Sequence, residues 1–180
     1  TRLRRLTAGR QSSQFLGNSG TARSLRKHME CLSRVDGPLL VSGERGSGKH
    51  LLAHLLHQRS ARRAQAVRLV NCAECFDEAV VAASSTTTVL LEHAAQLPDA
   101  AQQRLLGYLL VHPRASLVTL DGGELMQAVQ QRRFSRDLFH LLATQRLHTP
   151  NLREQPGDLL LLAEHFAKQH GELVGPQKRP

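Results

Sequence analysis

Large aromatic side chains are scarce in this chain, which has no tryptophan and only 3% aromatic residues among its 180 positions. A core without large rings has to be built from leucine, valine and alanine, and 41% hydrophobic residues is sufficient for one ordinary folded domain. The arginine clusters "RLRR", "RSARR" and "QQRR" have no aromatic residues between them, which disfavours nucleic-acid binding by base stacking.

Cysteine is also scarce, since the chain contains only Cys31, Cys72 and Cys75. An odd, low number argues for a reducing compartment and against a disulfide framework. The segment "NCAEC" holds one C-x-x-C pair, but zinc needs about four ligands and no second pair follows, so two reduced thiols are the favoured interpretation. The chain has no signal peptide and no apolar run of about 18 residues, which predicts a cytoplasmic protein without a membrane span.

Acidic residues are outnumbered, with 15 Asp and Glu against 24 Lys and Arg, and the net charge is +9. A basic chain favours anionic partners such as a nucleotide, a nucleic acid or an acidic protein. Arg132, Arg133 and Arg136 form one basic patch, which is either a solvated face or a contact for an anionic ligand or a partner subunit. Residues 1–14 resemble a linker, and together with the polar tail "GPQKRP" they predict a piece of a longer protein.

Strand-like and helix-like segments alternate along the chain. Short apolar runs bounded by turn residues predict buried parallel strands over 37–43, 66–71, 86–93, 115–121 and 145–150. Apolar residues at helical spacing predict helices over 21–35, 50–61, 99–110, 123–134, 136–143 and 157–173. The alternation predicts an α/β fold in which a five-stranded parallel sheet is flanked by helices.

The segment "GERGSGKH", residues 43–50, lies between a predicted strand and a predicted helix. Its G-x-x-x-x-G-K spacing is that of a phosphate-binding loop, in which glycines turn backbone N–H groups toward a phosphate and the lysine reaches the β- and γ-phosphates. The positive end of the following helix adds to the attraction. The predicted nucleotide-binding residues are Gly43, Glu44, Arg45, Gly46, Ser47, Gly48, Lys49 and His50. The alternative is a glycine-rich turn that only tightens the strand-helix joint.

Three positions bear on metal binding and catalysis. His50 stands where a hydroxyl would coordinate Mg²⁺, and imidazole is a poor ligand for that hard cation. The strand over 86–93 ends in Glu92, the predicted indirect metal ligand, and His93, which takes the position of a catalytic base. Glu92 and His93 are therefore the candidate catalytic residues, and the expected cofactor is ATP or ADP, with Mg²⁺ left open.

Three histidines share one face of the helix that follows the loop. His50, His54 and His57 lie at spacings of i, i+4 and i+7. Such a face can hold a metal ion, but a structural role is the favoured interpretation.

Six separated motifs occur in order: "LGNSGTARSL" (16–25), "GERGSGKHLLAHLLHQRS" (43–60), "VNCAE" (70–74), "TTTVLLEHAAQLP" (86–98), "RRFSRDLFHLL" (132–142) and "PNLRE" (150–154). Together they resemble the central AAA+ ATPase domain of bacterial sigma-54-dependent transcription activators, the enhancer-binding proteins. The resemblance runs from about residue 15 to about residue 170. It implies a P-loop AAA+ core over 15–153 and the beginning of a helical lid and tail over 154–180. It also implies that Gly17 lets the backbone approach the adenine.

The resemblance carries further implications for activity and partners. Members of the family form ATP-driven rings, usually hexamers, that remodel RNA polymerase bound to sigma-54, and they bind DNA through a separate C-terminal domain. Their loop commonly ends in Lys-Glu, so a residue without a hydroxyl at position 50 is itself familiar. The departure at His50 is therefore from Glu to His.

Two departures concern the acidic strand and the segment before it. The family carries an insertion with the motif G-A-F-T-G-A between the "NCA" strand and the acidic strand, whereas only 20 residues separate Asn71 from Glu92 here and none resembles that motif. The family's paired acids Asp-Glu are replaced by Glu92 and His93.

Two further departures concern residues that sense or reach the γ-phosphate. The family pattern F-R-x-D-L-x-x-R places two arginines where this chain has Ser135 and Leu141, and Arg136 is one residue out of register. A helix turns about 100° per residue, so Arg136 is poorly placed to substitute. The polar sensor position falls at Asp121 and Gly122, where the family has Thr-Asn or Thr-His.

The leading hypothesis is a divergent AAA+ nucleotide-binding regulatory domain of an enhancer-binding-type transcription regulator. It would bind ATP with weak or no hydrolysis and would not remodel sigma-54, so contact with RNA polymerase is doubtful. Self-association into a dimer or ring is left open. The alternatives are a slow genuine ATPase that uses Glu92 and His93 in an activator ring, and an interaction module that binds no nucleotide.

Overall fold

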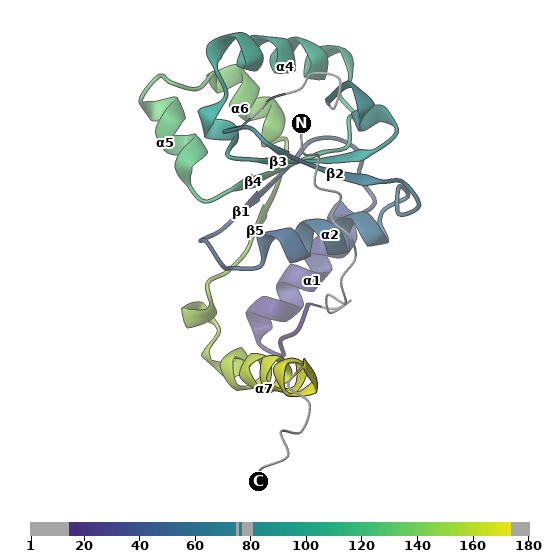
Figure 1. Cartoon of the computed structure of the whole chain (residues 1–180), viewed down its shortest axis with the longest axis vertical. Helices are drawn as coiled ribbons and strands as arrows, with labels where there is room; N and C mark the ends of the chain where they lie inside the picture. Colours follow the sequence, from purple (N-terminus) through teal and green to yellow (C-terminus); the bar gives the residue numbers. More distant parts are fainter. Residues whose placement is uncertain (1–14, 75, 77–80, 174–180) are drawn as a thin grey trace.

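One parallel sheet organises the molecule, of which the computed structural model describes residues 15–74, 76 and 81–173. The strands lie in the order β2-β3-β4-β1-β5 (Figure 1). Their bounds are β1 Leu39–Ser42, β2 Val67–Asn71, β3 Thr88–Glu92, β4 Leu117–Asp121 and β5 Gln145–His148. Every pairing is parallel, which confirms the predicted five-stranded α/β sheet.

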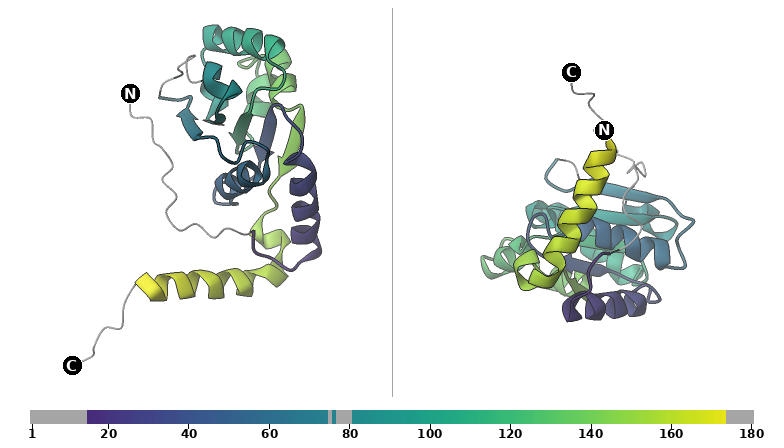
Figure 2. Two further views of the ribbon diagram at one scale, coloured as in Figure 1. Left: turned by 90° about the vertical axis from the view of Figure 1, so that its right-hand side faces the viewer. Right: turned by 90° about the horizontal axis from the view of Figure 1, so that it is seen from below.

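Helices cover both faces of this sheet (Figure 1). On one face lie α1 (Gly20–Leu32) and α2 (Lys49–Arg59), and on the other lie α4 (Asp99–Val111), α5 (Glu124–Gln130) and α6 (Arg136–Leu142). Three short 3₁₀ turns, η1 (Ala83–Ser85), η2 (Ala94–Gln96) and η3 (Leu152–Glu154), lie in the connections. The last helix, α7 (Pro156–Leu173), extends away from the sheet (Figure 2). None of the helices in the described part of the chain is long and apolar enough to cross a membrane.

The two faces of the sheet carry separate apolar cores, because side chains alternate along each strand. Toward α4 and α6, Leu91 and Leu117 pack in one cluster with Leu105 and Leu138. Toward α1 and α2, a second cluster contains Val41, Leu90, Val118, Met29 and Leu52. Leucine, valine and alanine supply most of the buried residues, as the shortage of aromatic residues predicts.

The predicted elements are observed, most of them with shorter bounds, and the predicted end of one helix is wrong. A helix was expected over 123–134, but α5 ends at Gln130. Arg132 adopts a left-handed conformation at φ 58°, and the N–H groups of Arg133 and Phe134 both donate to the carbonyl of Ala128. The chain turns here because Phe134 is buried in the core below α4, and a continued helix would carry it elsewhere.

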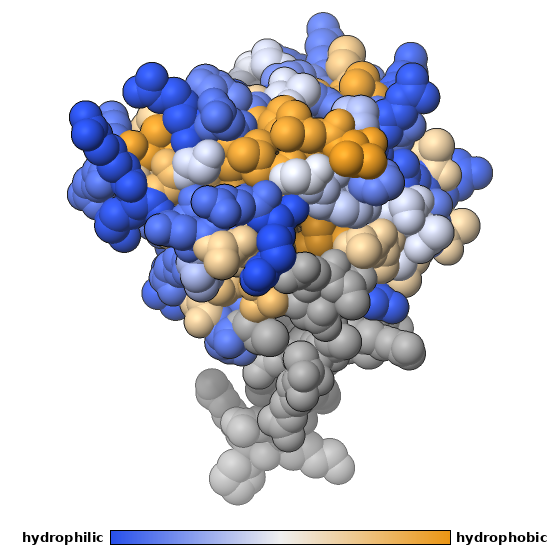
Figure 3. Space-filling model, turned by 90° about the horizontal axis from the view of Figure 1, so that it is seen from above, coloured by the Kyte–Doolittle hydropathy of each residue, from blue (hydrophilic) through white to orange (hydrophobic). Residues whose placement is uncertain are grey.

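The outer surface of the α4 layer is partly apolar. Figure 3 looks onto this side and shows an apolar band across it. Leu110 and Val111, at the end of α4, are 65% and 73% exposed. This surface therefore carries apolar area that no element in the described residues covers.

The first turn of α7 is attached to the segment that precedes α1. Asp158 is buried, and its Oδ1 accepts hydrogen bonds from the N–H groups of Asn18, at 2.6 Å, and Ser19, at 3.0 Å. Its Oδ2 accepts from the Ser19 hydroxyl at 2.5 Å, and that hydroxyl in turn caps α1 by accepting from the N–H of Ala22. The Ser19 hydroxyl and the two amides hold the pKa of Asp158 below its usual value. One carboxylate therefore fixes the start of the predicted lid to the start of the core.

We predict that Asp158→Ala lowers the free energy of unfolding by about 2–3 kcal/mol at neutral pH, because three donors lose a charged acceptor. The folded-state pKa lies below the unfolded value of about 4, so this stabilisation is complete above that pH and is lost as the pH falls through the folded-state pKa. Urea unfolding at neutral and acidic pH measures both effects.

The matched control is Asp99→Ala, which removes an exposed carboxylate from the first turn of α4. It should cost less than about 1 kcal/mol. A gap between wild type and Asp158→Ala that stays constant into acid would contradict a role for the ionised carboxylate.

Candidate functional site

The segment 43–48 forms a tight loop from β1 into α2. Gly43 has φ 154°, and a Cβ atom there would lie 2.7 Å from Ser47 Oγ and 2.9 Å from the carbonyl oxygen of Thr149. Gly48 caps α2 with φ 90° and has no side chain to bind the first-turn amides. The N-terminal N–H groups of α2 are therefore directed out of the loop without a capping side chain, which is the arrangement that binds phosphate in other helices.

Lys49 is the first residue of α2 and lies over the loop. Its Nζ donates to the carbonyl oxygens of Gly43, at 2.6 Å, and Glu44, at 2.8 Å. Glu44 is itself bound by the chain that follows β5, since its Oε1 accepts from Asn151 Nδ2 at 2.9 Å and pairs with the guanidinium of Arg153. The loop is therefore connected to the segment that leads into α7.

A cleft of about 1120 Å³ opens beside the loop at the carboxyl ends of the strands. It is lined by Glu44, Arg45, Lys49, His50, Glu92, His93, Ala94, Ala95, Gln96, Leu120, Asp121, Gly122, Glu124, Gln127 and Arg133. Because parallel strands end at one edge of a sheet, residues distant in sequence meet here. Most of the predicted site residues that carry a side chain at the loop or at the end of β3 share this one space.

Gly17 is the one predicted binding residue outside the loop 43–50, and it does not line this cleft. It has φ 142°, and a Cβ there would lie 2.8 Å from both Ala22 Cβ and Asp158 Oδ2. Its carbonyl accepts from Arg26 at 2.6 Å. The structure accounts for this glycine by close packing against α7, and its approach to an adenine stays a prediction.

His50 and Glu92 hydrogen-bond to each other across the cleft, through Nε2 and Oε1. Their side chains come from the start of α2 and the end of β3, and they are 53% and 22% exposed. The sequence named each residue as a departure from the family pattern, but nothing in it indicated that the two contact each other.

The side chains present do not fit a conventional magnesium site. Position 50 has no oxygen, and the carboxylate predicted to hold the metal is bonded to an imidazole. Within the residues that the structure describes, no three His, Cys, Asp or Glu side chains are arranged to hold a metal ion. The predicted indirect role of Glu92 toward Mg²⁺ stays a prediction.

Asp121 and Glu124 add two further acids to the cleft lining. Asp121, at the end of β4, is buried and accepts from the N–H of Leu125 at 3.1 Å, and burial raises its pKa. Glu124 accepts from the N–H of Gly122 at 2.8 Å, and its own backbone amide and that of Gly122 hold its pKa below the usual value. The sequence indicated Asp121 as a sensor position but missed Glu124, whose only signal is its place three residues after a strand end.

His93 follows Glu92 directly and is exposed at the edge of the cleft. It adopts a left-handed backbone conformation at φ 54°, which is uncommon for a residue with a side chain. The turn into η2 begins at this residue. Its position is compatible with the predicted base, which stays a prediction.

The turn between α5 and α6 and the first turn of α6 contain Arg133, Ser135 and Arg136, which are the candidate arginine-finger or basic-patch positions. Ser135 caps α6, because its hydroxyl accepts from the N–H of Leu138, and its own N–H donates to the buried Gln102. Arg136 is exposed on the first turn of α6, outside the cleft lining. Arg133 does line the cleft, so this member of the predicted basic patch lies closest to the loop's own ligand space.

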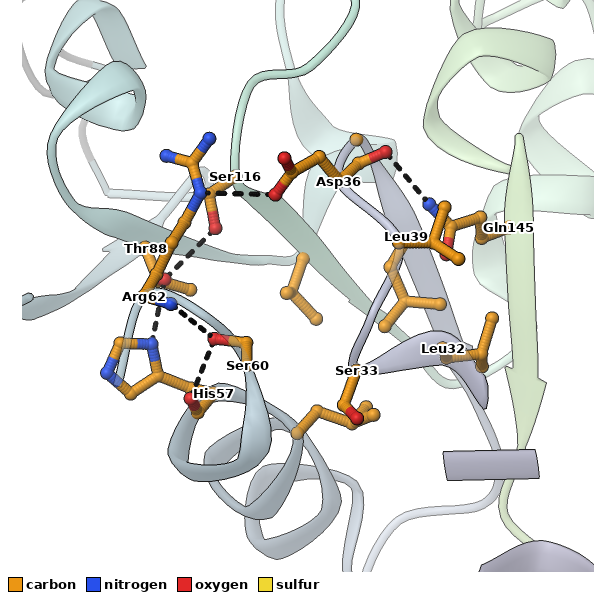
Figure 4. Close-up of a pocket in the computed structure, with 14 residues that line it drawn as sticks. Leu32, Ser33, Asp36, Leu39, His57, Ser60, Arg62, Thr88, Ser116 and Gln145 are labelled. Atoms are coloured by element: carbon orange, nitrogen blue, oxygen red, sulfur yellow. Dashed lines mark hydrogen bonds and ion pairs between the residues drawn. The ribbon is translucent and has the colours of Figure 1, made fainter. Parts of the chain in front are cut away.

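The other predicted metal positions have structural explanations. His57 is buried, and its Nδ1 lies 2.8 Å from Thr88 Oγ1 while its Nε2 lies 3.1 Å from the carbonyl oxygen of Gln65. These contacts border a small pocket of about 50 Å³ at the amino ends of the strands, on the edge opposite the loop (Figure 4). Burial lowers the pKa of His57 and raises that of Cys72 to about 12, whereas Cys75 lies outside the described residues.

Comparison with known proteins identifies the family. Residues 16–152 match the sigma-54 interaction domain. The regulatory protein LuxO of Vibrio cholerae serotype O1 is 30% identical over 200 aligned residues, which cover 92% of this chain and 38% of LuxO. The nitric oxide reductase transcription regulator NorR2 of Cupriavidus necator is 31% identical over 196 aligned residues, which cover 90% of this chain and 38% of NorR2.

Solved structures show the same fold. NtrX from Brucella abortus in complex with ATP gives a TM-score of 0.80 at 22% identity, over 92% of this chain and 43% of that one. The P-loop NTPase domain of the sigma-54 transport activator from E. coli gives a TM-score of 0.60 at 17% sequence identity, and the match covers 76% of this chain and 99% of that one. The chain spans well under half the length of the curated relatives above. It belongs to the sigma-54 interaction domain family, the AAA+ P-loop domain of sigma-54-dependent transcription regulators.

Proposed function

We propose that this domain binds ATP or ADP on the loop 43–50 and serves a transcription regulator as a nucleotide-responsive part. The observation that carries the proposal is the loop itself, in which a glycine-shaped turn, the uncapped start of α2 and Lys49 converge beside one cleft. Structures of NtrX from Brucella abortus in complex with ATP and with ADP, which share the fold, support it.

Weak or absent hydrolysis is the second part of the proposal. Glu92 is bonded to His50, and His93 replaces the acid that polarises the attacking water in the family. Ser135, at one expected arginine-finger position, is used as a helix cap, and the other expected finger is Leu141. An arginine finger contributes roughly 10³–10⁵ in rate where one acts, so losing both leaves little beyond binding.

The third part is that the domain does not remodel sigma-54. β2 ends at Asn71 and β3 begins at Thr88, and the lack of any resemblance to the family's G-A-F-T-G-A motif in the sequence between them supports this part of the proposal. DNA contact would come through a separate C-terminal domain of the longer protein. The exposed apolar surface at the end of α4 is compatible with self-association into a dimer or ring.

Calorimetric titration with ATP tests the first part. Lys49→Ala should weaken ATP binding about 10–100-fold, because charge-assisted hydrogen bonds to phosphate contribute roughly 1.5–3 kcal/mol. The control Lys27→Ala removes an exposed lysine from α1 and should leave the affinity unchanged. No binding at millimolar ATP by the wild-type domain would support the nucleotide-free interaction module instead.

Steady-state phosphate release tests the second part. The expected turnover of the wild-type domain is near the background rate and does not differ from that of Lys49→Ala. Turnover that depends on Lys49 would show a genuine ATPase. In that case His93→Ala would decide whether the imidazole is the base, because it should then abolish the activity.

A further inference from the structure

The contact between His50 and Glu92 has a consequence for how a nucleotide is held. In a P-loop site the metal ion depends on two side chains, a ligand at position 50 and a carboxylate at the end of the acidic strand. Here those two side chains are hydrogen-bonded to each other. An imidazole that donates its Nε2 hydrogen satisfies the same carboxylate oxygen that would otherwise orient metal-bound water.

The remaining acids near the loop are also engaged. Glu44 pairs with Arg153 and Asn151 on the outer side of the loop. Asp121 is buried and accepts from the N–H of Leu125, while Glu124 accepts from the N–H of Gly122. Each of these acids therefore already has a partner in the cleft, whereas a bound magnesium ion normally takes one or two carboxylates together with the phosphates.

Positive charge for the phosphates is available from the protein. Arg45, Lys49 and Arg133 all line the cleft and come from the loop, the start of α2 and the turn after α5. Arg133 is exposed and its guanidinium donates to Gln131 Oε1, a neutral partner, and no ion pair of Arg133 is observed among the described residues. Guanidinium groups bind phosphate oxygens in pairs of hydrogen bonds and need no metal to do so.

The geometry points to a nucleotide site that takes ATP without a requirement for magnesium. The two side chains expected to serve the metal, His50 and Glu92, bind each other instead. Arg45, Lys49 and Arg133 then supply the positive charge that neutralises the triphosphate. This inference rests on the proposed nucleotide binding and adds to it the ionic form of the ligand.

The test compares ATP affinity in excess EDTA with ATP affinity in excess Mg²⁺, by calorimetry on the whole chain. For the wild type the two dissociation constants should agree within about threefold. His50→Ser introduces a hydroxyl at position 50 and releases Glu92, so Mg²⁺ should then tighten ATP binding about tenfold or more. The matched control His54→Ser makes the same change one turn further along α2, where the imidazole contacts only Gln58 among the hydrogen-bond partners described, and should behave as wild type.

A second variant tests whether the protein, rather than a metal ion, supplies the positive charge that balances the triphosphate. Arg133→Gln keeps a polar side chain of similar reach and should weaken ATP binding at least about fivefold in EDTA, because the protein rather than the metal carries the countercharge. An unchanged affinity in EDTA would overturn this part of the inference.

The outcomes distinguish this inference from the proposed function. Binding of ATP by the wild type that is tightened tenfold or more by Mg²⁺ would overturn the metal-independent site and leave the proposed function intact. Absence of ATP binding in both solutions would overturn the proposed function and the inference with it. Equal affinities in both solutions, together with magnesium dependence in His50→Ser, would establish the inference.

Discussion

The alignment of the strand ends at one edge of the sheet is the constraint on which the rest of the structure depends. β1 lies between β4 and β5, and its last residue, Ser42, is level with Asp121 and His148. The N–H of Gly43 continues the ladder by donating to the carbonyl of Asp121, and the N–H of Thr149 donates to that of Ser42. The loop is therefore anchored on both sides before it turns into α2, and its shape follows from the sheet as much as from its glycines.

Two connections extend this anchor toward α7. Arg153 and Asn151 hold Glu44 at the loop, and Asp158 holds the segment before α1. Both connections are electrostatic, and both join segments separated by more than 100 residues. The Asp158 contacts are the more costly of the two to break, since a buried carboxylate cannot leave its donors without a large desolvation cost.

The cleft combines a loop backbone shaped for phosphate with side chains that hydrogen-bond to other protein groups. The backbone of the loop and the position of Lys49 follow the requirements of phosphate binding. The side chains around them have different partners, because His50 bonds Glu92 and Ser135 caps a helix.

The succession of strands and helices along the chain, the glycine-rich loop and the resemblance to the family could all be read from the sequence. These features depend on local spacing of apolar residues and on a motif of contiguous residues, which a chain displays before it folds. Three features become visible only in the folded chain: α5 ends at Gln130, Gly17 packs against Asp158, and Glu124 and Arg133 share the cleft with the loop. The contact between His50 and Glu92 is likewise visible only there. These residues lie far apart in sequence or at a change of chain direction, and only the packing of parallel strands brings their side chains to a common edge.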